Sequence, residues 1–130
     1  MIVNMKRDME LIRKILIEIE KQYIDVALYN LKVEEYDLKT VTYHCKILYE
    51  AGLISDYSGF YADDELYSFG VGSLTWEGHE FLDKIREDKI WNKTKQVMKD
   101  KGIPFILDAV KEIATSVVDG MIQGAIKGMI

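Results

Sequence analysis

The sequence predicts a mostly helical protein of the α+β class. Two segments, residues 5–22 and 38–52, place apolar side chains every three or four residues, which is the spacing of one helix face. Between residues 53 and 74, aromatic residues mix with acidic ones and glycines stand near both ends, which is typical of two strands joined by a turn. Helical spacing then returns and continues to about residue 127.

Size and composition favour one compact domain with an appendage. The chain has 130 residues, of which 48% are hydrophobic and 30% charged, the balance of a soluble globular protein. Its single cysteine, Cys45, excludes an internal disulfide framework and suits a reducing cytoplasm, and the N-terminal pattern is neither a signal peptide nor a transmembrane span. The net charge of -5 argues against indiscriminate nucleic-acid binding, because that binding needs a broad cationic surface. We therefore expect a cytoplasmic protein.

The first half of the chain predicts two helices separated by a link. A helix from about residue 5 to 22 is expected because apolar residues are spaced four, three, four, three and four apart, at Met5, Met9, Ile12, Leu16, Ile19 and Tyr23. Residues 23–35 nearly alternate between apolar and polar, which indicates a short strand or an irregular link. Asp37 is expected to cap a second helix that ends at Gly52 and buries Leu38, Val41, Cys45 and Leu48.

The second half predicts two strands and further helices. An acidic turn near residues 62–65 joins the strands, and Thr75 then caps a helix that runs to about Glu87. A break near Asp88 precedes another helical stretch, in which apolar positions recur until Gly102, and Pro104 is expected to begin the last helix. The apolar sides of these two middle helices are predicted at Trp76, Phe81, Leu82 and Ile85, and at Trp91, Thr94 and Met98.

The order helix, link, helix, strand, strand, helix is that of a winged helix-turn-helix domain. YHCKILYEAGLI, at 43–54, has the form of a recognition helix that runs into the first wing strand. LTWEGHEFL, at 74–82, resembles the LT-x-x-G-x-x-x-L that returns the chain from the wing in many bacterial winged-helix regulators. The segment before residue 37 departs from the pattern because it looks partly extended. We assign residues 1–102 to a winged helix-turn-helix-like domain and 103–130 to a C-terminal helical extension.

Three blocks of sequence carry a closer resemblance. KRDMELIRKILIEIE at 6–20, VTYHCKILYEAGLI at 41–54, and LTWEGHEFLD followed by WNKTK at 91–95 resemble a family of short bacterial and prophage proteins, domain of unknown function 2513. The blocks cover most of residues 6–101. The resemblance implies a winged-helix-like fold and a phage-associated origin, and it brings no activity or catalytic residues.

Two functions based on binding compete. One is a DNA-binding transcriptional regulator, because the outer side of the second helix presents four candidate contacts, Lys39, Thr40, Tyr43 and Lys46. That side lacks Arg, Asn and Gln, and residues 55–75 carry a net charge of -4, which phosphates would repel. The alternative is an adaptor for a host or phage protein, with three exposed aromatic anchors at Tyr57, Tyr61 and Tyr67. The expected partner is thus double-stranded DNA or a protein.

The sequence offers few residues for catalysis or for metal binding. His44 and Cys45 are adjacent, so on a helix they point about 100 degrees apart and do not approach one ion together. We expect His44 at the edge of the core and His79 on a helix surface. The acidic run at residues 63–65 is expected to be solvated, and neither a phosphate loop nor a nucleophile elbow accompanies it. The sequence therefore predicts no enzyme, no cofactor and no metal.

The C-terminal segment predicts self-association. From Phe105/Ile106 to Met129/Ile130, apolar pairs recur every four residues, so the apolar stripe winds around a helix and one domain surface does not cover it. Glycines on the same spacing permit close helix contact. The predicted homo-oligomer contacts are Val117, Gly120, Met121, Gly124, Ala125, Ile126 and Gly128. The alternatives are a tail that is disordered beyond about residue 118 and attachment to a membrane surface, whereas charged residues exclude a membrane crossing.

Overall fold

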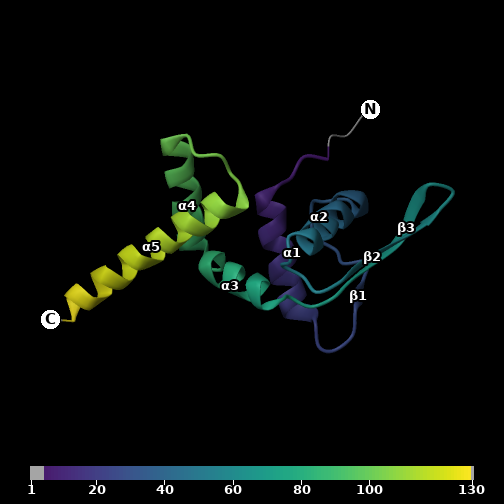
Figure 1. Ribbon diagram of the computed structural model, residues 1–130, viewed down its shortest axis with the longest axis horizontal. Helices are drawn as coiled ribbons and strands as arrows, with labels where there is room; N and C mark the ends of the chain where they lie inside the picture. Colours follow the sequence, from purple (N-terminus) through teal and green to yellow (C-terminus); the bar gives the residue numbers. More distant parts are fainter. Residues whose placement is uncertain (1–4, 130) are drawn as a thin grey trace. The chain divides into compact units, whose positions relative to one another are not determined.

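The computed structural model describes residues 5–129 of the chain and confirms a mostly helical α+β fold (Figure 1). Residues 1–4 and Ile130, the last member of the predicted apolar pairs, lie outside the described residues. The described part contains five helices and a three-stranded antiparallel sheet. It divides into two compact units, Met1–Glu80 and Phe81–Ile130. The second unit thus begins before residue 103, where the sequence suggested a boundary.

Helix α1 (Met9–Gln22) begins later than the apolar spacing predicts, because Asp8 caps it. The Asp8 carboxylate accepts hydrogen bonds from the backbone N–H groups of Glu10 and Leu11, at 2.9 and 3.3 Å. Met5 therefore lies before the helix, and Tyr23 follows its last residue. The remaining predicted positions are buried, and two further side chains join them, so that the buried apolar face is Met9, Leu11, Ile12, Ile15, Leu16 and Ile19.

The link after α1 contains β1 (Leu28–Tyr29) and a turn at residues 34–36, so the expected partly extended segment is confirmed. Helix α2 (Leu38–Glu50) then begins at the predicted cap, where the Asp37 carboxylate accepts the Thr40 N–H at 2.9 Å. Its buried apolar side chains are Val41, Cys45 and Leu48. Gly52 follows with a φ of 77°, a left-handed conformation that favours glycine.

Strands β2 (Tyr57–Ala62) and β3 (Glu65–Val71) form the predicted hairpin with its acidic turn. Asp63 and Asp64 make that turn with φ values of 53° and 63°. β3 is the central strand of the sheet, which has the order β1-β3-β2, and Val71 pairs with both Leu28 and Tyr57. Figure 1 shows the hairpin extending beside α2 within the first unit.

The LTWEG stretch fastens the start of α3 (Trp76–Ile85) to the end of α2. The Thr75 hydroxyl donates to the Gly52 carbonyl at 2.6 Å and accepts the Gly78 N–H at 3.0 Å. A Cβ at Gly78 would collide with the Leu53 carbonyl oxygen, so this position requires glycine. One prediction for α3 is wrong: Trp76 does not join its apolar side but is 76% exposed, because it stands at the first turn.

Helices α4 (Asp88–Lys101) and α5 (Leu107–Gly128) pack against each other in the second unit. α4 buries the three predicted side chains Trp91, Thr94 and Met98 and ends at Gly102, whose φ is 64°. The prediction that Pro104 begins the last helix is wrong by three residues. The Ile106 N–H donates to the Pro104 carbonyl at 2.9 Å in a turn, and α5 starts after it.

Candidate functional site

A groove lies between α2 and the β2–β3 hairpin, and we call it the α2–hairpin groove. One side comes from α2 and the other from the hairpin, and Met5 contributes from the segment before α1. Its lining residues are Met5, Lys39, Thr42, Tyr43, Lys46, Tyr57, Tyr61, Asp64 and Leu66. The groove therefore combines two lysines, three tyrosines, one carboxylate and apolar groups.

The groove unites most members of two sets of residues that the sequence kept separate. Lys39, Tyr43 and Lys46 were candidates for DNA contact, and Tyr57 and Tyr61 were candidates for protein contact. They meet because the hairpin packs on α2. The sequence did not indicate this meeting, since α2 and the hairpin approach each other only through the tertiary fold.

Two predicted residues lie outside the groove. Thr40 is half-buried, and its carbonyl oxygen is engaged by the His44 ring at 2.8 Å. Tyr67 follows Leu66 in β3, and successive strand residues point to opposite faces, so Tyr67 lies on the far face of the hairpin. There its ring is 6.4 Å from the Phe60 ring, centroid to centroid. Tyr61 and Tyr67 are almost equally exposed, at 60% and 61%.

The charges of the groove partly cancel. Lys39 Nζ lies 3.8 Å from Glu65 Oε2, and both side chains are mostly exposed. Such a surface pair contributes little to stability, about 0–1 kcal/mol. It nevertheless places the negative charge of the turn beside the cationic side of α2, and Asp64 lines the groove itself. The sequence indicated an acidic wing but not its proximity to Lys39.

Tyr57, in β2, is a neutral hydrogen-bonding group of the groove. Burial raises the pKa of Tyr57 to about 12, and the neighbouring Tyr61, which shares a hydrogen bond with it, adds to this rise. A neutral phenol both donates and accepts hydrogen bonds while its ring provides apolar surface. These properties suit contact with a protein segment.

His44 and Cys45 are closed to ligands. Burial raises the pKa of the Cys45 thiol to about 12, which keeps it protonated. His44 lies deeper than the predicted core edge, because it is fully buried and both ring nitrogens have backbone partners at 2.8 Å, Asp8 and Thr40. His79 is exposed on α3, as predicted. Within residues 5–129, no three His, Cys, Asp or Glu side chains are grouped so that they could hold a metal ion.

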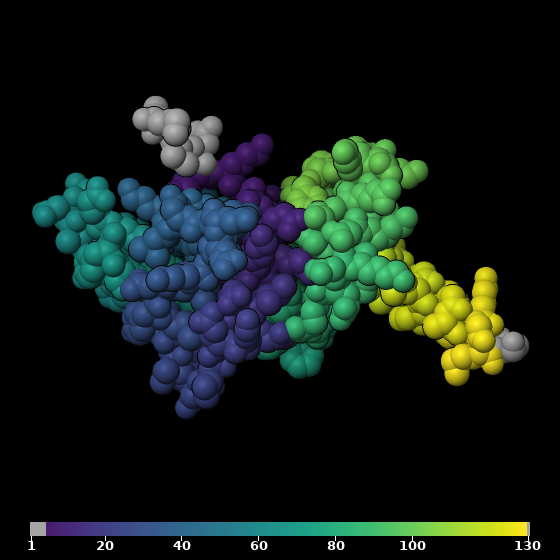
Figure 2. Space-filling model, turned by 180° about the vertical axis from the view of Figure 1, so that it is seen from behind, coloured from purple at the N-terminus to yellow at the C-terminus, as the bar shows by residue number. Residues whose placement is uncertain are grey.

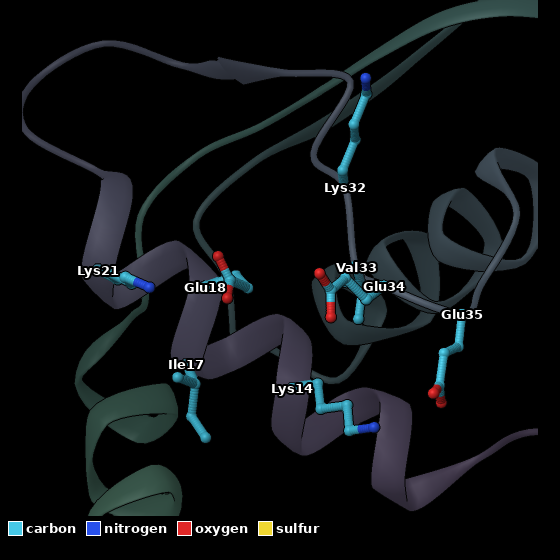
Figure 3. Close-up of a pocket in the computed structure, with 8 residues that line it drawn as sticks. All are labelled: Lys14, Ile17, Glu18, Lys21, Lys32, Val33, Glu34 and Glu35. Carbon is cyan, nitrogen blue, oxygen red and sulfur yellow. The ribbon is translucent and has the colours of Figure 1, made fainter.

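A second groove lies between α1 and residues 32–35 (Figure 3). Lysines and glutamates of both segments line it, and Figure 3 shows Lys32 pointing away from α1. Glu18 accepts a hydrogen bond from the Gln22 amide at 2.7 Å, and Lys14 Nζ lies 5.6 Å from the centroid of the Tyr36 ring. Two of its charged groups, Glu18 and Lys14, therefore have local partners, and the mixture of both charges is typical of a solvated surface.

Most of the predicted oligomer contacts are exposed on α5. Val117 is half-buried and the other six are exposed, and a Cβ at Gly120, Gly124 or Gly128 would have no neighbour within 4 Å. Whether these residues self-associate stays a prediction. None of the helices formed by residues 5–129 is long and apolar enough to cross a membrane.

The family of the chain follows from comparison with known sequences. The model of a family described as hypothetical protein, DUF2513, matches residues 6–104. The chain belongs to the DUF2513 family. It is also 41% identical over 121 residues to an uncharacterized protein of Haemophilus influenzae, an alignment that covers 91% of this chain and 99% of that relative. No solved structure matches the chain. The family match includes the whole α2–hairpin groove except Met5, and it ends before α5.

Proposed function

We propose that the protein is a non-enzymatic winged-helix adaptor that binds a segment of a host or phage protein in the α2–hairpin groove. The order α1, β1, α2, β2, β3 and the sheet order β1-β3-β2 support a winged-helix architecture, with α2 as recognition helix and the hairpin as wing. The turn at residues 34–36 stands where the additional helix of a helix-turn-helix pair would lie. A phage-type origin is part of the proposal.

The observation that carries the proposal is the acidic turn beside the lysines of α2. A DNA phosphate approaching Lys39 would also approach Glu65, whose carboxylate is 3.8 Å from the lysine nitrogen. The repulsion is not local, because residues 5–80 contain eight basic and fifteen acidic residues. Nucleic-acid binding depends on replacing phosphate counterions with a cationic surface, and this unit is anionic. A protein segment of mixed character is the better match.

The side chains that line the groove indicate which kind of partner segment would bind there. Lys46 can bind a carboxylate, Tyr57 and Tyr61 offer flat rings with hydroxyl groups, and Leu66 adds apolar area. Tyrosine is one of the residue types enriched among those that contribute most to binding free energy at protein interfaces. We therefore expect a partner segment that carries an acidic residue next to an aromatic or aliphatic one.

Photo-crosslinking within the bacterial host tests this function. A photoreactive amino acid replaces Tyr61 in one protein and Tyr67 in a matched control, which is equally exposed on the opposite face of the hairpin. The adaptor requires a discrete protein adduct at 61 that Lys46→Glu removes, and no such adduct at 67. Equal adducts at both positions, or none at 61, would overturn the proposal.

The DNA-binding regulator remains the second candidate, because Lys39, Tyr43 and Lys46 do share one side of α2 in the groove. A mobility-shift assay at low salt, with promoter DNA and random duplex, decides between the two. The adaptor predicts no shift for the natural protein. It predicts at most weak binding after Asp63→Asn, Asp64→Asn and Glu65→Gln together neutralise the turn, because residues 5–80 stay anionic. A salt-sensitive shift that Lys39→Glu and Lys46→Glu abolish would establish the regulator instead.

A further inference from the structure

One face of α5 is buried near its start and continues uncovered to its end. Val110 and Ala114 are fully buried in the unit where α5 packs on α4. Continuing from them at steps of three or four residues, the same face passes through Val117, Met121, Gly124 or Ala125, and Gly128. The face that packs on α4 is therefore apolar or small along its entire length.

α4 packs on only the first part of α5 because α4 is the shorter helix. α4 has 14 residues and α5 has 22, which correspond to lengths of about 21 and 33 Å. Beyond Val117 the apolar side chains become exposed, with Met121 at 45%, Ile122 at 48% and Met129 at 86%. In Figure 2 no other part of the second unit covers the distal, yellow part of α5 on the visible face. We call residues 117–129 the uncovered segment.

We propose that the uncovered segment binds the same segment of a second copy, with the two helices antiparallel and their two-fold axis at Gln123. In this arrangement Met121 lies level with the partner's Ala125, and Val118 lies level with the partner's Gly128. In both pairs a large side chain meets a small one, and symmetry repeats each pair. Nothing occupies the space within 4 Å of a Cβ at Gly128, so the partner's Val118 can enter it.

The helix geometry directs charge away from this contact. At 100 degrees per residue, Met121, Ala125, Val118 and Gly128 all lie within about 40 degrees of the symmetric contact line. The charged and amide side chains of the uncovered segment, Asp119, Gln123 and Lys127, fall on the opposite side. The dimer therefore buries no unpaired charge. Gly120 and Ile126 also point away, so two of the seven residues predicted from the sequence lie outside the contact.

Other occupants match the segment less well. A parallel pair would place Met121 against Met121 and glycine against glycine, which leaves crowding and gaps. A membrane surface prefers a cationic polar face, and the uncovered segment carries one lysine and one aspartate. A charged partner helix would find no complementary charge on the apolar face. A second copy supplies a matching order of large and small side chains.

The expected dimer is weak and reversible. The uncovered segment is about 20 Å long, so its contact is smaller than the roughly 800 Å² per partner of a standard interface. Sedimentation velocity on the full chain between about 1 and about 200 micromolar should therefore show a monomer converting to a dimer. Met121→Lys should weaken association by at least about tenfold, because it places a charge on the contact line. Ile126→Lys is the matched control, with 48% exposure and an outward direction, and it should leave association unchanged.

Disulfide trapping tests the orientation. Val118→Cys and Gly128→Cys are made in separate full-length proteins, while the natural Cys45 stays buried. An antiparallel pair centred on Gln123 yields a covalent dimer when the two variants are mixed and oxidised. Neither variant should form a disulfide with a second copy of the same variant. In such a pair the two introduced cysteines lie about 15 Å apart along the helix axis. Self-bridging of either variant would overturn the antiparallel arrangement. A full chain that stays monomeric throughout the range would overturn self-association, and circular dichroism confirms that each variant is folded.

Discussion

At the scale of single residues, His44 shows how one buried side chain joins two helices. Its Nε2 faces the backbone N–H of Asp8 at 2.8 Å and must accept that hydrogen bond. Its Nδ1 therefore carries the proton and donates to the Thr40 carbonyl at 2.8 Å. Asp8 in turn caps α1 and accepts the Tyr36 hydroxyl at 3.2 Å. Burial, followed by the charge of Asp8, raises the pKa of Tyr36, so this hydroxyl stays a donor.

His44→Phe replaces the imidazole with another aromatic ring but removes both hydrogen bonds. It should lower the free energy of unfolding by about 1–3 kcal/mol. The cost arises because the Asp8 N–H and the Thr40 carbonyl lose their side-chain partner. Urea denaturation followed by circular dichroism measures it. His79→Phe, at an exposed position of α3, should change stability by less than about 0.5 kcal/mol. Similar effects of the two substitutions would contradict this role of His44.

Asp37 predicts a pH dependence of stability. Hydrogen bonds from the Thr40 hydroxyl and then its N–H hold the pKa of Asp37 below its ordinary value of 3.8. Because the pKa is lower in the folded state, the stabilisation is complete above 3.8 and is lost as the pH falls through the folded value. Asp37→Ala should cost about 0.5–2 kcal/mol near neutral pH and less in acid. Urea denaturation of both proteins at neutral and at acid pH measures this difference in the free energy of unfolding. An equal loss of stability at the two pH values would rule out a charged cap at Asp37.

At the scale of elements, glycines with identical chemistry have opposite structural roles. Gly78 lies against the Leu53 backbone at the start of α3, whereas Gly120 in α5 has open space around its Cβ position. The LTWEG stretch thus joins α2 to α3 through backbone contact. In α5 the glycine instead lowers the intrinsic stability of the helix, because glycine favours helices less than alanine does.

Gly78→Ala and Gly120→Ala should therefore change stability in opposite directions. The first should destabilise by at least about 2 kcal/mol, because the added methyl group collides with the Leu53 carbonyl. The second should stabilise α5 by about 1 kcal/mol through helix propensity. Thermal unfolding of the two variants compares them directly. A tolerated alanine at position 78 would show that the contact between α2 and α3 is looser than described.

At the scale of the whole molecule, α4 depends on α5. The Phe105 ring lies 5.6 Å from the Trp91 ring, centroid to centroid, and Trp91 is only 1% exposed. Because α4 and α5 belong to the second unit, cutting the chain after Gly102 divides that unit instead of separating two domains.

Tryptophan fluorescence can follow the loss of α5. Trp76 is exposed, so Trp76→Phe leaves the buried Trp91 as the only tryptophan, which can be excited selectively at about 295 nm. In the full chain we expect a blue-shifted emission maximum, and in a chain that ends at Gly102 the maximum should move to longer wavelength as water reaches the ring. An unchanged maximum would show that α5 does not protect Trp91.

Elements with local causes could be predicted from the amino-acid sequence. Apolar spacing in α1 and α2, the caps at Asp37 and Thr75, and the acidic turn at Asp63 and Asp64 all follow from neighbouring residues, and the structure confirms them. The start of α5 was misplaced because proline favours a helix start but does not require one, and here a turn follows it.

Which of these elements contact one another became clear from the folded chain. The burial of His44, the exposure of Trp76 and the shared groove of Lys39, Lys46 and Tyr61 depend on contacts between residues far apart in the chain. Periodicity shows which side of a helix is apolar. It does not show which element packs on that side, or along how much of the helix. For α5 this packing ends where the shorter helix α4 ends. It depends on the lengths of both helices, so the periodicity of one helix does not predict it.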